Sequence, residues 1–241
     1  MKKVLLLDDD KDLRALLRTS LAARGLEVVE AARVRDAERL LQQGPVDVAV
    51  IDGLLPDGPG LEFVERLRGH DGKVRVVFLS AYYRDAHTFM RLTQMLDVSL
   101  VLYKPVEPES FAEKVAELAG APAGAGGGDL AQELAELHRQ FAEQLPAKIK
   151  VVEEEVAAAR TDSQRLPRAR DLAHALRGSA GSYGFSAISE SMGVVEYLLA
   201  DASAQRDPWR PYFWEEINAA LRESRKASAR AVEQLRQGDP R

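Results

Sequence analysis

The first half of the chain repeats one pattern five times: a short apolar run, a turn, and then a segment with helical periodicity. The runs are rich in leucine and valine and are too short for helices, so we expect buried strands. Strands that alternate strictly with helices form a parallel sheet covered by helices on both faces, the α/β class. The expected strands are residues 4–7, 27–30, 48–51, 74–79 and 100–103.

The segments between these runs carry apolar residues at helical spacing. Gly25 is expected to end the first helix, and Gly44-Pro45 is expected to stop the second. We expect the helices at about residues 10–24, 34–43, 61–67, 85–96 and 108–118.

Polar residues follow four of the five runs directly. Asp8 and Asp9 follow the first run, Asp52 the third, Ser80 the fourth and Lys104 the fifth. Each has an ordinary alternative, because Asp favours turns and helix caps, and a serine or lysine is common in surface loops. In open α/β sheets, however, ligands bind at the carboxyl edge of the strands. Four coincident strand ends therefore favour a common site.

The chemistry of these residues is that of phosphoryl transfer. Carboxylates hold hard cations such as Mg²⁺, and an aspartate can act as a nucleophile that forms an aspartyl-phosphate. Asp52 is the candidate nucleophile. Phosphoryl oxygens need neutralising partners, which Mg²⁺ and Lys104 can supply, and Ser80 can donate a hydrogen bond.

Four motifs occur in order, LLLDDD, VIDGLLP, FLSA and LYKP, and with them residues 1–119 resemble a response-regulator receiver domain. The resemblance implies a flavodoxin-like (βα)5 fold with a parallel five-stranded sheet. It implies phosphorylation on Asp52, with Ser80 and Lys104 contacting the phosphoryl group. It also implies a Mg²⁺ site whose ligands are Asp8, Asp9, Asp52 and the backbone carbonyl of Leu54.

The sequence departs from the receiver pattern at one position. The family often has an aromatic switch residue three positions before the lysine, where this chain has Val101. Tyr103 is no obvious substitute, because it is the neighbour of Lys104 in the strand and neighbouring residues of a strand point to opposite faces.

The resemblance also places two bulky residues, Leu54 and Tyr82, beside the path by which water approaches the aspartyl-phosphate. Neither can orient a water molecule for attack, which predicts a long-lived aspartyl-phosphate.

Residues 119–128 contain only alanine, glycine and proline. We expect a flexible linker at residues 120–128, between a domain at 1–119 and another at 129–241. A phosphate-binding loop is excluded, because the motif lacks a following Lys-Ser/Thr and a preceding strand. Helical periodicity resumes after the linker and predicts an antiparallel four-helix bundle, with helices at about residues 129–156, 167–182, 186–202 and 208–235.

His174 is the candidate functional residue of the second half. It need not face the bundle core, so we expect an exposed side chain, and a capping or merely solvated histidine is the ordinary alternative. Arg177 lies one turn further along the same face and can bind a phosphoryl oxygen, while Gly178 clears space beside the imidazole. The other histidines are expected to be solvated: His70, His87 and His138.

The segment HALRGSAGSYG resembles the conserved motif of histidine phosphotransfer (Hpt) domains. The matching residues are His174, Arg177, Gly178, Ser179 and Gly184, and arginine replaces the more usual lysine. The resemblance covers about residues 129–238 and implies a four-helix bundle that carries phosphate on His174 without binding ATP. No Gly-rich ATP-binding segment occurs, so we do not expect a kinase, or an enzyme beyond phosphotransfer itself.

Composition excludes several other classes of protein. The chain has no cysteine, which rules out disulfides and thiol catalysis, and its net charge of −5 includes no basic half, which argues against nucleic-acid binding. Neither a signal peptide nor an apolar run of membrane-spanning length is found, so we expect a cytoplasmic protein with no membrane partner.

Together these features predict a two-component phosphorelay protein. The expected partners are a sensor histidine kinase and other receiver domains, and the receiver half can also form a homodimer. The alternative is a scaffold that does not relay phosphate, in which phosphorylation of the receiver gates a helical docking or dimerisation module.

Overall fold

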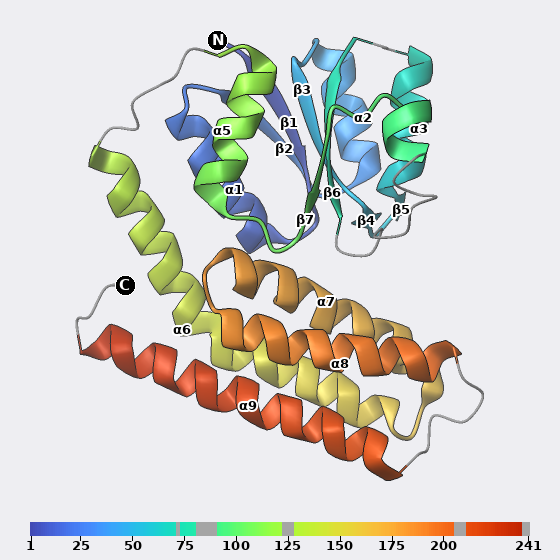
Figure 1. Ribbon diagram of the computed structural model, residues 1–241, viewed down its shortest axis with the longest axis vertical. Helices are drawn as coiled ribbons and strands as arrows, with labels where there is room; N and C mark the ends of the chain where they lie inside the picture. Colours follow the sequence, from blue (N-terminus) through green and yellow to red (C-terminus); the bar gives the residue numbers. More distant parts are fainter. Residues whose placement is uncertain (71–72, 81–90, 122–127, 205–210, 238–241) are drawn as a thin grey trace. The chain divides into compact units, whose positions relative to one another are not determined.

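The computed structural model describes residues 1–70, 73–80, 91–121, 128–204 and 211–237 (Figure 1). The chain divides into two compact units, Met1–Leu134 and Ala135–Arg241, which are described separately below. Within the described ranges, no helix has both the length and the apolar character needed to cross a membrane.

The first unit is built on a five-stranded parallel sheet, as the alternating pattern predicts. The strands lie in the order β2-β1-β3-β6-β7, and the central strand β3 is buried along its whole length. In this order β1 and β3 are neighbours although β2 separates them in sequence, so their carboxyl ends form a topological switch point. The strands are β1 Lys3–Leu7, β2 Glu27–Ala31, β3 Val48–Asp52, β6 Arg75–Ser80 and β7 Leu100–Tyr103.

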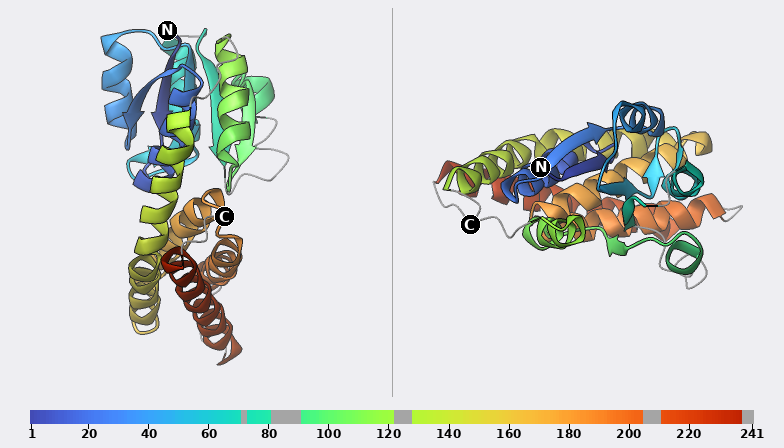
Figure 2. Two further views of the ribbon diagram at one scale, coloured as in Figure 1. Left: turned by 90° about the vertical axis from the view of Figure 1, so that its left-hand side faces the viewer. Right: turned by 90° about the horizontal axis from the view of Figure 1, so that it is seen from above.

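Helices cover both faces of this sheet (Figures 1 and 2). Helices α1 and α5 pack on one face, where the core includes Leu17 and Phe111, and α2 and α3 pack on the other, where it includes Phe63 and Phe78. The helices are α1 Lys11–Ala23, α2 Val34–Gln43, α3 Gly60–His70 and α5 Pro108–Ala119.

The fourth helix predicted for this half lies partly outside the described residues. Of the predicted range 85–96, residues 85–90 are not described, and Arg91–Met95 forms a π-helical turn, η1. Leu92 in this turn is fully buried in the core that α2 and α3 cover.

The loop after Asp52 contains a short ribbon that the sequence pattern did not indicate. Strands β4, Leu54–Leu55, and β5, Gly58–Pro59, pair antiparallel. Between them, the carboxylate of Asp57 accepts hydrogen bonds from the backbone N–H groups of Val34 (2.9 Å) and Arg35 (3.2 Å). Helix α2 has no capping side chain of its own next to it in sequence, so a residue from this loop caps its first turn.

Gly60, at the start of α3, has room for no side chain. A β-carbon at this position would overlap the backbone carbonyl of Asp52, and the N–H of Gly60 donates a 3.0 Å hydrogen bond to the carbonyl of Gly53. The start of α3 therefore touches the backbone that carries Asp52 as closely as only glycine permits.

The second unit contains the four predicted long helices. Helix α8 packs against both α7 and α9, and buried residues at helical spacing form the core, including Phe141, Ile149, Met192, Val195 and Ile217. The elements are α6 Gly128–Ala159, a 3-10 turn η2 Ser163–Arg165, α7 Leu166–Ser182, α8 Ser186–Ala204 and α9 Pro211–Arg236. The first residues of α6 group with the first unit, so the helix runs across the division between the units.

We predict that Gly60→Ala destabilises the first unit by about 1–3 kcal/mol, because α3 or the Asp52 backbone must shift to admit the new methyl group. Gly69→Ala, in the same helix, is the control: its β-carbon meets nothing within 4 Å, and alanine favours the helix.

Both tryptophans, Trp209 and Trp214, belong to the second unit, so their fluorescence does not follow this change. Hydrogen exchange of peptides from β1 and β3 in the full-length chain measures it. Equal protection in the two variants would contradict the close contact.

Candidate functional site

The strand-end residues predicted from the sequence meet at the carboxyl edge of the sheet. Asp8 follows β1, Asp52 ends β3, Ser80 ends β6 and Lys104 follows β7, and all four are buried. Asp9 lies beside them and is exposed. The arrangement follows directly from the topology, because β1, β3, β6 and β7 are parallel neighbours.

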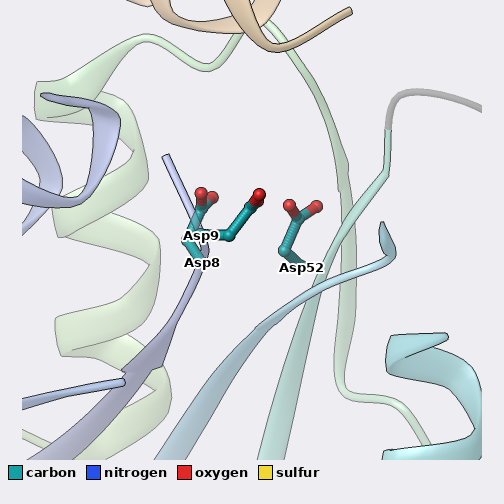
Figure 3. A group of neighbouring side chains, drawn as sticks. All are labelled: Asp8, Asp9 and Asp52. Atoms are coloured by element: carbon teal, nitrogen blue, oxygen red, sulfur yellow. The ribbon is translucent and has the colours of Figure 1, made fainter. Parts of the chain in front are cut away.

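The ammonium group of Lys104 joins the two buried carboxylates. Its Nζ lies 2.8 Å from Oδ2 of Asp8 and 2.9 Å from Oδ2 of Asp52. One oxygen each of Asp8, Asp9 and Asp52 lies within 4.8 Å of the others, and the three carboxylates point to the same side (Figure 3). When all three carboxyls are ionised, they and the one ammonium leave an excess of two negative charges, which suits a divalent cation.

Backbone contacts fix the position of these side chains. The N–H of Asp10 donates to Oδ1 of Asp8 (2.9 Å), and Arg14 donates to the carbonyl of Asp8 (2.6 Å). The N–H of Lys104 donates to the carbonyl of Ser80 (2.9 Å), which ties the last two strand ends together. The site is therefore held by the sheet and its adjoining turns.

Burial dominates the electrostatics of Asp52. Burial raises the pKa of its carboxyl from 3.8 to about 7, with the negative charges of Asp8 and Asp9 adding to the effect and Lys104 opposing it. Burial alone would lower the pKa of Lys104, but the carboxylates of Asp52 and Asp8 raise it above its usual range, so the amine stays charged. The pKa of Asp10 is also raised, first by burial and then by Asp8.

Other receiver residues singled out in the sequence lie around this cluster. Leu54 is in β4 with 40% of its surface exposed. Val101 is half-buried and packs against the core on the α2–α3 face, and Tyr103 is 37% exposed. Tyr82 lies outside the described residues, so its part in excluding water stays a prediction.

We predict that Asp52→Asn stabilises the first unit at alkaline pH when no divalent cation is present. Between pH 3.8 and about 7, folded Asp52 keeps a proton that the unfolded chain has lost, so the free energy of unfolding falls as pH rises through this window. The variant does not undergo that loss and should be more stable above pH 7 by up to about 4 kcal/mol, with no difference near pH 4.

Hydrogen exchange of β1 and β3 peptides in EDTA measures this difference, and Asp36→Asn on α2 is the control. If the native chain and Asp52→Asn are equally protected at pH 8, the buried charge does not destabilise the fold.

A second cluster lies in the bundle and joins α7 to α8. Nδ1 of His174 lies 2.8 Å from Oε1 of Glu196, and Nη1 of Arg177 donates to Oε2 of Glu196 at 3.0 Å. One carboxylate on α8 therefore contacts both of the α7 residues that the sequence predicts to be functional.

The expectation from the sequence that the side chain of His174 is exposed is wrong. Only 11% of its side chain is exposed, and Glu196 is more buried still at 5%. Periodicity correctly places His174 off the central stripe of α7, but α8 covers that flank. Arg177, with 31% of its side chain exposed, is the most accessible member of the cluster.

Glu196 is the functional candidate that the sequence analysis missed. Burial would raise the pKa of this carboxyl, but the hydrogen bonds and charges of His174 and Arg177 outweigh burial and lower it. The sequence pattern that could have identified Glu196 is an acidic residue on an apolar helix face. In the structure, the apolar residues Met192, Val195 and Leu199 of that face are fully buried. A buried carboxylate needs partners, and this one has two.

The remaining motif residues have structural positions. Gly178 and Ser179 are buried within α7, and the hydroxyl of Ser179 donates to the carbonyl of Ala175 (3.0 Å). Gly184 has φ of 82°, the left-handed conformation that commonly ends a helix. It follows α7 and turns the chain towards α8.

The expectation that His138 is solvated is wrong. It is half-buried on α6, and its ring stacks on Phe185 with centroids 4.8 Å apart. The prediction for His70 and His87 lies outside the side chains that the structure describes.

A hollow of about 270 Å³ lies between α6 and α9. Two of the arginines that line it already have partners, since Arg160 donates to Asn218 (2.6 Å) and Arg225 pairs with Glu153 (2.8 Å). The lining contains three arginines and one glutamate, so it keeps a net positive charge.

Comparison with known proteins matches both units to signalling domains. The response regulator receiver domain model matches residues 4–116, and the Hpt domain model matches residues 129–237. The receiver domain of Francisella response regulator 1452 has a similar structure, with a TM-score of 0.46 and 26% identity, over 50% of this chain and 98% of that one.

Two curated relatives are response regulators. Response regulator protein PilR of Pseudomonas aeruginosa is 35% identical over 81 residues, which cover 34% of this chain and 18% of PilR. Response regulator GtcR of Aneurinibacillus migulanus is 31% identical over 118 residues, 48% of each chain. The matched part of this chain thus spans about half or less of these relatives.

The fold and the family matches together identify two domains of the kinds found in two-component signalling. The chain joins a response regulator receiver domain to an Hpt domain.

Proposed function

We propose that the chain passes phosphoryl groups at two points: Asp52 accepts one from a phosphohistidine, and His174 carries one to or from receiver aspartates. The observation that carries the proposal is the 2.8 Å hydrogen bond between Nδ1 of His174 and the buried carboxylate of Glu196. It gives the imidazole a fixed orientation and a defined reactive nitrogen. The receiver domain is proposed to end near residue 119 and the Hpt domain to begin near residue 129, with a linker at 120–128.

In the receiver step, a carboxylate oxygen of Asp52 attacks the phosphorus of a partner's phosphohistidine. The new O–P bond forms as the N–P bond breaks, and the electron pair returns to the partner's imidazole. Lys104, 2.9 Å from Asp52, is placed to neutralise the incoming phosphoryl oxygens. Ser80, at the neighbouring strand end, supplies a hydroxyl donor.

The carboxylate cluster fits a bound Mg²⁺ ion, which would neutralise phosphoryl charge. Its ligands are proposed to be the three clustered carboxylates and one backbone oxygen, from Asp8, Asp9, Asp52 and Leu54. The donor set is all oxygen, as Mg²⁺ prefers, and the excess negative charge of the cluster favours a cation.

In the Hpt step, the nucleophile is Nε2 of His174. Because the ionised carboxylate of Glu196 can only accept a hydrogen bond, Nδ1 carries the proton and donates to it, which leaves the lone pair of the neutral ring on Nε2. Nε2 attacks the phosphorus of a receiver aspartyl-phosphate, the O–P bond breaks, and the electron pair returns to the carboxylate. Nδ1 keeps its proton, so positive charge develops on the ring, and Glu196 stabilises it.

Besides its hydrogen bond to Glu196, Arg177 is proposed to contact the phosphoryl group in this step. It is the most accessible cation beside His174, and it is placed to bind a phosphoryl oxygen as the group arrives. The partners proposed are a sensor histidine kinase for the receiver domain and other receiver domains for the Hpt domain. The rival proposal is a scaffold in which the bundle is only a docking module.

The two full-length variants His174→Gln and Asp52→Asn separate these proposals. Incubated with acetyl [³²P]phosphate and Mg²⁺, His174→Gln should gain an alkali-labile label, and EDTA should abolish it. The labelled His174→Gln chain then serves as the phosphoryl donor for Asp52→Asn. With this donor, or with phosphorylated receiver domains from the source organism, Asp52→Asn should gain an acid-labile, alkali-stable label on His174. If no donor labels His174, the scaffold proposal is correct and the relay is not.

We further predict that Glu196→Gln slows labelling of His174 about tenfold while the bundle stays folded. Glutamine has the same shape and can still accept the hydrogen bond, but a neutral amide does not stabilise the developing imidazolium charge. Glu190→Gln, exposed on the same helix, is the control. The initial rate of transfer is the measurement, and equal rates in the two variants would refute a catalytic role for the Glu196 charge.

A further inference from the structure

Helix α8 has a single glycine, Gly193, and it lies against the side chain of Arg177. A β-carbon at this position would lie 3.3 Å from Nε of Arg177 and 3.5 Å from both Cδ and Cζ. The side chain of Arg177 thus lies against α8 at a residue that has no side chain of its own. Gly193 precedes Glu196 by one helical turn, so the two residues lie on the same face.

This glycine is costly for the helix. It occupies the interior of a 19-residue helix, where glycine is the least favourable residue apart from proline. Its φ is not left-handed, so the backbone conformation does not require glycine. The feature of its surroundings that a methyl group would disturb is the stem and guanidinium of Arg177.

We propose that Gly193 is a positioning residue for phosphotransfer, an inference that rests on the function proposed for His174. The bare backbone at Gly193 lets Arg177 lie against α8 and reach Oε2 of Glu196 at 3.0 Å, while His174 uses Oε1 of the same carboxylate. The residue at position 193 thereby controls how the carboxylate is shared between its two partners.

A larger side chain should act on Arg177 rather than on the fold. The three atoms nearest to a new β-carbon all belong to a long, flexible side chain that is 31% exposed, so Arg177 can move outwards while the helices stay in place. Arg177 would have to give way by a few tenths of an ångström, which weakens its hydrogen bond to Glu196 and displaces the guanidinium.

A packing role and a positioning role predict opposite results for Gly193→Ala. If the glycine only allows close helix packing, alanine lowers stability. If it positions Arg177, the helix preference of alanine offsets the weaker pairing of Arg177 with Glu196, so the urea midpoint stays close to the native value while transfer to His174 slows about tenfold. Trp214 belongs to the same unit, so tryptophan fluorescence follows the midpoint.

The test uses the full-length chain with Asp52→Asn, so that label can appear only on His174. Gly193→Ala, Arg177→Ala and the double variant form a mutant cycle, with Ser191→Ala on α8 as the control. If Gly193 acts through Arg177, the glycine substitution has no further effect once the arginine is gone. Additive effects on the transfer rate, or an unchanged rate in Gly193→Ala, would overturn the inference.

A spectroscopic readout keeps this inference separate from the proposed function. The Nε–H of Arg177 should give a distinct ¹⁵N–¹H signal that shifts in Gly193→Ala and stays in place in Ser191→Ala. If the native chain cannot be labelled on His174, the proposed function fails while this signal still tests the positioning. An unshifted signal would refute the positioning even in a chain that transfers phosphate.

Discussion

The receiver site is organised around one buried interaction, the ammonium of Lys104 held between the carboxylates of Asp8 and Asp52. An ammonium removed from water is stable only with opposite charge at close range, and the two aspartates supply it. The same aspartates would repel each other without the lysine. Because each residue comes from a different strand end, the pairing requires the correct strand order.

This interaction also sets the chemistry of the edge. Two carboxylates share one ammonium and a third lies within 4.8 Å, so the cluster remains short of positive charge. Protonation of Asp52 or binding of a divalent cation are two ways to correct the imbalance. The bundle reaches balance differently: Glu196 is buried between a histidine and an arginine, with its charge already matched.

Residues at strand ends could be predicted from sequence because parallel strands bring their carboxyl ends to one edge whatever the details of packing. That reasoning placed Asp8, Asp52 and Lys104 together correctly. Contacts between helices were not predictable in the same way. Periodicity says which face of α7 carries His174, but not how far α8 covers it, so the burial of His174 and its bond to Glu196 needed three-dimensional information. The contact of Gly60 with the Asp52 backbone is similar, since a glycine in the sequence does not reveal its neighbour.

The loop that leaves Asp52 has two anchors on the same side of the sheet. At Gly60 it meets the start of α3 at the closest approach that a backbone allows, and through Asp57 it holds the first turn of α2. Neither anchor involves α1 or α5, which cover the opposite face. A rearrangement of this loop would therefore act directly on α2 and α3, the helices that cover one face of the sheet.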